Sequence, residues 1–148
     1  MRAMRSKACS RAWRKGVAVD EVVALDGGRA FGLLTRAQGT PKGRAVVLFN
    51  AGLIHRMGPF RLHVQLARRL AAQGLDVFRF DMPRIGDAPA GAHADAESVV
   101  REVLDTVQAS TGARGFIVGG ICSAAGQGWR TAPGDTRVDG GVLLGGMA

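Results

Sequence analysis

The sequence predicts an α/β protein with a mainly parallel sheet, flanking helices and an N-terminal antiparallel hairpin. After residue 44, apolar strand segments alternate with amphipathic helical segments, which is typical of parallel sheets. Those strands are continuously apolar rather than alternating, as expected where both faces of a sheet are covered. A chain of 148 residues can bury the sizeable core of one such domain.

The N-terminal hairpin is predicted from two apolar segments separated by a turn sequence. Residues 17–25 and 30–36 are the expected strands, and Asp26, Gly27 and Gly28 favour the tight connection between them. A third strand is expected over residues 45–50.

The next segments predict a helix and a strand. Pro59 favours a helix start and Gly74 a helix end, so we expect a helix over residues 59–73, followed by a strand over residues 75–80. Its expected apolar face consists of Leu62, Leu66, Ala67, Leu70 and Ala71. Residues 81–92, marked by Gly and Pro, are expected to form a loop.

The last third continues the alternation. Residues 95–109 carry apolar side chains at i, i+3, i+4 and i+7 spacing, which predicts an amphipathic helix. A strand over residues 116–120, a helix over residues 123–132 and a strand over residues 140–145 complete the expected order.

The net charge of +8 is concentrated at the N-terminus. Six basic residues and no acidic residue precede Asp20, which leaves +2 for the rest. We therefore divide the chain into a basic, disordered leader at residues 1–16 and a domain at residues 17–148. The leader lacks the apolar segment of a secretory signal. Polyanion binding through the leader is the weakest of the functions considered, so no specific nucleic-acid partner is expected.

The cysteine content favours a reducing, cytoplasmic setting. Cys9 and Cys122 are the only cysteines, their placement does not suggest a disulfide scaffold, and no metal-ligand spacing is present. No metal, cofactor or membrane span is expected, because no apolar run approaches the ~20 residues that a span needs.

Cys122 lies at the apex of a small-residue turn that follows an apolar strand. The segment Gly120-Ile121-Cys122-Ser123-Ala124 has the spacing of a nucleophile elbow, whose strained turn requires small flanking residues. A frame centred on Ser123 would place the bulky Ile121 at a flanking position, so Cys122 is the preferred nucleophile. The alternative is a buried structural cysteine, and on the motif alone the two interpretations are balanced.

A second turn offers a partner for the elbow. An apolar strand that begins near Arg44 ends in Asn50-Ala51-Gly52. In acyl-transfer sites, one oxyanion donor is the N–H after the nucleophile and another comes from the loop after such a strand. These expected donors are the backbone N–H groups of Ser123 and of Ala51, Gly52 or Leu53. An ordinary strand-to-helix loop is the alternative.

These segments together resemble the α/β-hydrolase superfamily. The resemblance rests on the order Asn-Ala-Gly-Leu-Ile-His-Arg at 50–56, Arg-Phe-Asp at 79–81, Ile-Gly-Asp at 85–87 and Gly-Ile-Cys-Ser at 120–123. It is closer to bacterial members that open their first long helix with this Asn-to-Arg run, and it covers about residues 30–145. Arg84 and Ala88 occupy positions in the loop after the fourth strand where such proteins usually have Gly and Ser.

The resemblance implies a partial α/β-hydrolase fold that ends before the strands carrying the family's catalytic acid and histidine. We therefore expect a truncated domain whose nucleophile lacks visible partners. His55 is expected to form hydrogen bonds at the helix entry or to line the pocket, with a small chance of acting as base, and Asn50 is expected to line the pocket. His63 is expected to be a surface or interface residue, and His93 a loop or cap residue. Asp81 and Asp87 are expected to form turns or anchor hydrogen bonds.

Three functions follow from the sequence. The first is hydrolysis of a small-molecule ester, thioester or related acyl substrate through Cys122, with little or no activity in this chain. The second is a non-catalytic remnant or partner-binding fragment, in which an oligomer or partner covers an exposed sheet edge. The third is polyanion binding through the leader.

Overall fold

The computed structural model describes residues 18–90, 95–123, 126, 130 and 132–145. The leader expected at residues 1–16, His93 and most of the helix expected over residues 123–132 lie outside the described residues. A six-stranded sheet of order β1-β2-β4-β3-β5-β6 organises the rest. The predicted class, a mainly parallel sheet with an antiparallel N-terminal pair, is confirmed.

The hairpin consists of β1 (Asp20–Leu25) and β2 (Ala30–Thr35), joined by the short 3-10 turn η1 (Asp26–Gly28). Asp20 lies opposite Thr35 in the antiparallel register. Strand β2 then pairs antiparallel with β4 and so attaches the hairpin to the parallel strands.

The parallel strands are β3 (Arg44–Leu48), β4 (Asp76–Phe80), β5 (Gly115–Ile121) and β6 (Val138–Leu144). Strand β3 is central, with β4 on one side and β5 on the other. The segments that follow β3, β4 and β5 therefore leave the same edge of the sheet.

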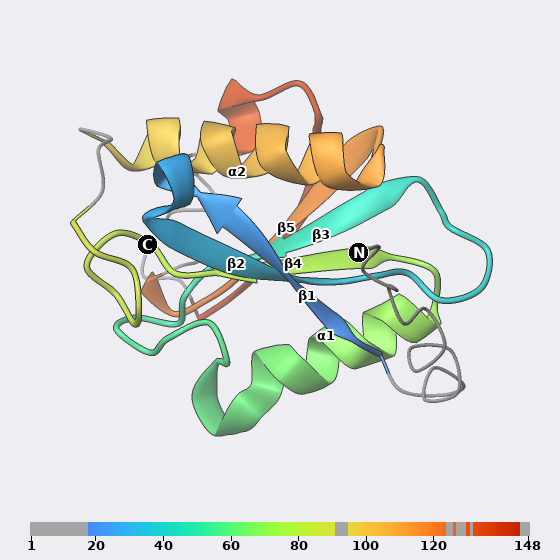
Figure 1. The fold of residues 1–148 in the computed structure, drawn as a ribbon, viewed down its shortest axis with the longest axis horizontal. Helices are drawn as coiled ribbons and strands as arrows, with labels where there is room; N and C mark the ends of the chain where they lie inside the picture. The colour runs from blue at the N-terminus through green and yellow to red at the C-terminus, as the bar shows by residue number, and fades with distance from the viewer. Residues whose placement is uncertain (1–17, 91–94, 124–125, 127–129, 131, 146–148) are drawn as a thin grey trace, which may run out of the picture.

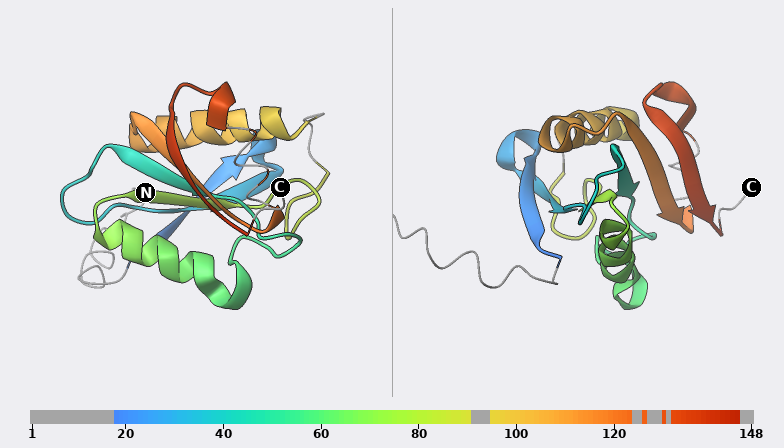
Figure 2. Two further views of the ribbon diagram at one scale, coloured as in Figure 1. Left: turned by 180° about the vertical axis from the view of Figure 1, so that it is seen from behind. Right: turned by 90° about the vertical axis from the view of Figure 1, so that its right-hand side faces the viewer.

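One long helix covers each face of the sheet, α1 (Leu62–Ala72) on one side and α2 (Ala96–Thr111) on the other (Figures 1 and 2). Alternation along each strand divides the core accordingly: Val47 and Phe78 belong to the cluster that includes the apolar face of α2, whereas Val46 and Val77 pack with Ala67 of α1. Helix α2 begins where Asp95 accepts a hydrogen bond from the Ser98 N–H and ends before Gly112, whose φ is 71°.

Helix α1 starts later than its sequence predicts. Pro59 begins a short 3-10 turn, η2 (Pro59–Arg61), in which Phe60 has φ 50°, and Arg61 is left-handed with φ 60°. The α-helix therefore begins at Leu62. Of the expected apolar face, Ala67 and Ala71 are buried, and Leu66 and Leu70 pack against the core.

The expectation that His63 lies at the surface is wrong. Its imidazole is buried together with Val64, Ala67 and Ala71, whereas Leu62, expected on the apolar face, is exposed. A Cβ on Gly58 would lie 2.6 Å from the His63 ring, so the absence of a side chain at Gly58 makes room for it. His63 lies four residues before Ala67 and eight before Ala71, so helical spacing places it on the same buried face of α1.

A buried ion pair ties β1 to the centre of the sheet. The Arg79 guanidinium, 1% exposed, donates to the Asp20 carboxylate at 2.7 Å, and Asp20 also accepts a hydrogen bond from the Thr35 hydroxyl. Asp20 thereby compensates the positive charge of Arg79, which lies on the face of the sheet that α1 covers.

Candidate functional site

The segments after β3, β4 and β5 gather at one end of the sheet (Figure 1). They bring together the loop that precedes α1, residues 81–90 after β4, and the turn at Cys122. The candidate site lies at this edge, where ligands of open parallel sheets usually bind.

Cys122 occupies a sharp turn directly after β5. Its φ is 62°, in the left-handed region that costs a non-glycine residue about 1–2 kcal/mol. The Cys122 N–H donates to the Leu144 carbonyl at 2.8 Å, so the strand β6 helps to hold the turn. The thiol is free and exposed, and the strained backbone that the sequence predicted is observed.

The turn after β3 lies beside this cysteine turn. A Cβ built on Gly52 would lie 3.9 Å from the Ser123 hydroxyl oxygen, and Gly52 itself has φ 62°. Among the described residues, no acceptor receives the backbone N–H of Ala51, Gly52, Leu53 or Ser123. Two turns that are distant in sequence therefore present unoccupied N–H donors at one edge.

A buried carboxylate holds the loops after β3 and β4 together. Asp81 accepts hydrogen bonds from the Asn50 amide at 2.9 Å and from the Arg56 N–H at 2.6 Å. It also pairs with the Arg56 guanidinium and accepts the Asp87 N–H. Asn50 in turn donates to the Ile54 carbonyl and accepts the Met82 N–H at 2.7 Å. We call Asn50, Arg56, Asp81 and Asp87 the loop anchor.

Arg56 is the cation of the loop anchor. Its guanidinium bridges Asp81 and Asp87 and lies 4.4 Å from the centre of the Phe31 ring, an additional cation–π contact. The hydrogen bond from Arg56 and its positive charge lower the pKa of Asp87 below its ordinary value. The arginine is nearly buried, so its charge is compensated by these carboxylates rather than by water.

The two residues expected to line the pocket have structural partners. Asn50 borders the cavity described below, but its amide group is engaged by the Asp81 carboxylate and by the backbone of Ile54 and Met82. The His55 Nδ1 atom accepts the Met57 N–H at 3.1 Å, which agrees with the expected role at the helix entry. Within the part of the chain that the structure describes, no hydrogen bond joins the Cys122 thiol to a histidine or an acid.

Sequence reasoning did not identify Arg56 as a structural residue. The available signal was a charged side chain at the end of an otherwise apolar run, with two aspartates after the following strand. The expected anchoring role of Asp81 and Asp87 is confirmed, although their shared partner was not anticipated.

A cavity of about 310 Å³ lies at this edge. Its described lining consists of Asn50, Gly52, Leu53, Ile85, Ser123 and Arg130. It therefore touches all three converging segments and lies against the residue that follows Cys122. This volume is at the lower end of the range for small-molecule sites.

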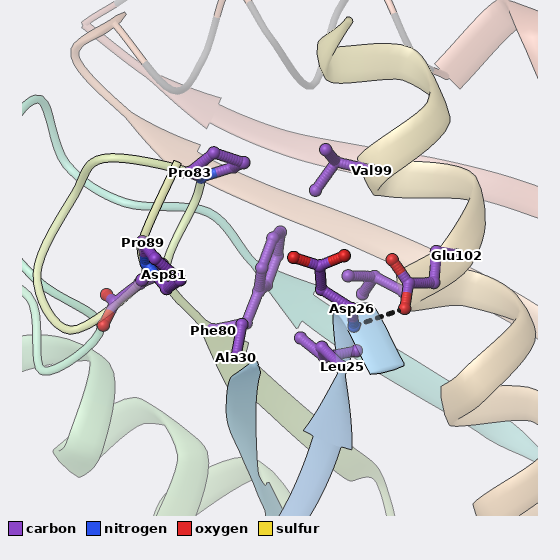
Figure 3. A pocket seen from close by; sticks show the side chains of 11 residues that line it. Leu25, Asp26, Ala30, Phe80, Asp81, Pro83, Pro89, Val99 and Glu102 are labelled. Atoms are coloured by element: carbon purple, nitrogen blue, oxygen red, sulfur yellow. Dashed lines mark hydrogen bonds between the residues drawn. The ribbon is translucent and has the colours of Figure 1, made fainter. Parts of the chain in front are cut away.

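A second cavity, between the hairpin and α2, is only about 20 Å³, enough for one water molecule. Figure 3 shows Phe80 and Val99 beside it, and the Asp26 N–H donating to Glu102 at 2.6 Å. The Asp81 carboxylate points away from this space (Figure 3), toward the loop anchor. The hydrogen bond beside this cavity joins the hairpin to α2. The cavity itself is too small for an acyl substrate.

The described residues contain no group of three or more His, Cys, Asp or Glu side chains placed to hold a metal ion. None of the helices in these residues is long and apolar enough to cross a membrane.

Comparison with known proteins identifies the fold. No protein-family model and no curated protein sequence matches the chain. Among solved structures, DcsB in complex with its substrate analogue is similar with a TM-score of 0.70 and 14% identity, over 88% of this chain and 46% of that one. A putative α/β hydrolase from Agrobacterium tumefaciens has a TM-score of 0.66 and 17% identity over 87% and 61% of the two chains. The α/β hydrolase GrgF from Penicillium sp. sh18 has a TM-score of 0.66 and 16% identity over 88% and 46%.

These similarities show that the described residues have part of an α/β-hydrolase fold. The chain spans between about half and three fifths of the length of these structures. The fold expected from the sequence resemblance is thus confirmed.

The loop anchor predicts unequal effects for its two aspartates. Asp81→Ala removes the acceptor of four hydrogen bonds and leaves Arg56 partly uncompensated in a buried position, so we expect a loss of about 3–5 kcal/mol in the free energy of unfolding. Asp87→Ala removes the exposed, water-screened partner of the same arginine and should lower the free energy of unfolding clearly less than Asp81→Ala does. Urea unfolding of both variants measures the difference, and equal losses would contradict the assignment of Asp81 as the central acceptor.

His63 predicts a pH-dependent stability. Burial, and secondarily the charge of Arg79, lower the pKa of His63 below its ordinary value of 6.5, so folding favours the neutral imidazole. Its contribution is complete above pH 6.5, and it is lost as the pH falls through 6.5 toward the folded-state pKa, because the unfolded chain binds the proton first.

The measurement is the urea midpoint at about pH 8 and about pH 5.5. The difference between the two should be smaller in His63→Leu than in the unchanged protein. Val64→Ala provides the control, since it removes a buried neighbour of His63 on α1 without removing a titratable group and should leave the pH dependence unaltered. An unchanged pH dependence in His63→Leu would reject the explanation.

Proposed function

We propose that Cys122 is the nucleophile of an acyl-transfer site that acts on a small-molecule ester, thioester or related acyl compound. The observation that carries this proposal is the left-handed backbone of an exposed cysteine at the end of β5. A sharp strand-to-helix turn of this kind presents its apex side chain above the sheet. A cysteine with a purely structural role would not need such a backbone or such exposure.

The reaction would begin when the Cys122 thiolate attacks the acyl carbonyl carbon. A carbon–sulfur bond forms, the bond to the leaving alcohol or thiol breaks, and that leaving group takes a proton from solvent. Water then attacks the thioester, releasing the carboxylic acid and restoring the thiol. No cofactor or metal is needed for either step.

The oxyanion of the tetrahedral intermediate requires donors close to the sulfur. The N–H of Ser123, directly after the nucleophile, and one N–H among Ala51, Gly52 and Leu53 are suited to this role. The proposal is supported by the short distance between Gly52 and Ser123 and by the absence of acceptors for these groups among the described residues. Each such donor is typically worth about 10²–10³ in rate.

Activation of the thiol is the weaker part of the site. No base contacts Cys122 within the described residues, and general-base catalysis typically contributes about 10²–10⁴ in rate. A cysteine tolerates this lack better than a serine, because a few per cent of free thiol is ionised at neutral pH. We therefore propose a slow acyl transfer by this chain, in a reducing, cytoplasmic setting that keeps the thiol free.

The experiment uses an activated thioester and intact-protein mass spectrometry. The unchanged protein should gain one acyl group and release the thiol product, whereas Cys122→Ala should do neither. Ser123→Ala keeps the backbone donor and is the matched control, which should retain acylation within about twofold. Acylation that persists in Cys122→Ala, or that maps elsewhere in the unchanged protein, would reject the nucleophile.

The exposed edge of the sheet favours a second candidate function, partner binding. Strand β6 pairs with β5, and its other edge faces no strand within the described residues. Val142 and Leu144 are more than half exposed on it. An unpaired apolar edge is a template for another strand, so we propose that a strand from a partner, or from a second copy of the chain, covers β6.

Self-association tests this second candidate. Val142→Lys should shift the protein toward the monomer in multi-angle light scattering, because a charge opposes edge-to-edge pairing. Val22→Lys, on the exposed face of β1 at the opposite edge of the sheet, is the control and should leave the mass distribution unchanged. Identical behaviour of the two variants would exclude pairing through β6.

A further inference from the structure

The cavity at the candidate site has an unequal distribution of charge. Leu53 and Ile85 give it an apolar part, Asn50 and Ser123 give it polar groups, and Arg130 is the single charged residue of its described lining. No carboxylate belongs to that lining. An anion entering this space would therefore meet a cation and no opposing charge.

Arg130 is available to bind such an anion. Its side chain is exposed and forms no ion pair or hydrogen bond with any described residue. Arg56, by contrast, lies at the same edge and is held by Asp81 and Asp87. The guanidinium is planar and permanently charged, and it binds carboxylate or phosphate groups through paired N–H donors.

Exposed apolar side chains lie along the chain between Leu53, which lines the cavity, and the first residue of α1. Leu53 is 88% exposed, and four more exposed apolar side chains follow it in the sequence. We call these residues the apolar ridge: Leu53, Ile54, Met57, Phe60 and Leu62. Large apolar side chains exposed within residues 53–62 offer apolar surface to a ligand.

Phe60 shows that core packing does not explain the ridge. Its side chain is 98% exposed, and both Phe60 and Arg61 have left-handed backbones, which are unfavourable for residues other than glycine. The chain thus holds an aromatic ring in solvent at the expense of backbone strain. Strain at an exposed position is a reason to look for a ligand there.

We infer that the acyl substrate is an amphipathic anion, whose carboxylate or phosphate binds Arg130 and whose apolar chain lies against Leu53 and extends over the apolar ridge. This inference rests on the proposed function for the identity of the reacting group. It adds a substrate class, because a neutral ester of the same length would lack the contact with Arg130.

Binding is measured by calorimetry in a Cys122→Ala background, so that chemistry plays no part. Monomethyl sebacate, which carries a carboxylate, is compared with neutral dimethyl sebacate, which has the same chain. We expect the anionic ester to bind about fivefold more tightly, which corresponds to an exposed charge contact. This preference should decrease in about 0.5 M salt.

Variants separate the two contacts. Arg130→Gln should abolish the preference for the anion, and Arg130→Lys should retain most of it. Arg68→Gln, an exposed arginine of α1 outside the cavity, is the matched control and should keep the full preference. Leu53→Ser should weaken the binding of both esters by a similar factor of about three.

Dodecyl phosphate below its micelle concentration then tests which anion the site prefers. If Arg130→Gln weakens the binding of dodecyl phosphate more than that of monomethyl sebacate, the preferred group is phosphate. If it weakens the binding of dodecyl phosphate less, the preferred group is carboxylate.

Equal affinity for the two sebacate esters, or equal effects of the Arg130 and Arg68 substitutions, would overturn the inference. That result is independent of the acylation experiment, because the binding protein lacks the thiol. Acylation of Cys122 without an anion preference rejects the substrate class alone. An anion preference without acylation rejects the nucleophile alone.

Discussion

The candidate site depends on one buried carboxylate, that of Asp81. An isolated charge at this depth would be strongly unfavourable, and it is tolerated because the donors of the loop anchor surround it. Asn50 and Arg56 come from the loop after β3, and the Asp87 N–H comes from the loop after β4. Compensation of the charge therefore requires both loops to take one arrangement. The position of Gly52 and Leu53 beside the Cys122 turn follows from that arrangement.

Backbone strain is concentrated at the same edge of the sheet. Cys122, Phe60, Arg61 and Arg84 all have positive φ, and each lies in a segment near the carboxyl ends of β3, β4 or β5. The Arg84 N–H is held by the carbonyls of Ala88 and Pro89, and the Cys122 N–H by that of Leu144. Hydrogen bonds to neighbouring segments thus fix conformations that the local sequence would not adopt alone. Such positions are where a rigid sheet can support a functional site.

Much of the fold could be predicted from the sequence because periodicity reports which face of an element is buried. The helix expected over residues 95–109 is observed as α2, and the continuously apolar strands form the parallel part of the sheet. The burial of His63 agrees with helical spacing, since it lies four residues before Ala67 on the buried face of α1, and the prediction was wrong because a polar side chain was expected outside the core. Arg56 was missed for a different reason: its partners lie after the next strand, and a single charge in the loop after β3 does not specify them. The turn at Cys122 was predictable because the small residues that flank it indicate a tight turn in which larger side chains would clash.

In the proposed function, the positioning of a nucleophile is separate from its activation. Positioning depends on β5, the hydrogen bond to Leu144 and the loop anchor, all of which lie within the described residues. Activation by a base would require a further side chain near the thiol, which the described residues do not provide. These contributions are distinct in kind, since oxyanion donors act on charge that develops during reaction, whereas a base supplies the thiolate beforehand. A cysteine is the residue for which the two can be separated with some reactivity left, because its thiolate forms without help. Cys122, rather than Ser123, at the apex of the turn is therefore what makes slow acyl transfer chemically reasonable for this chain.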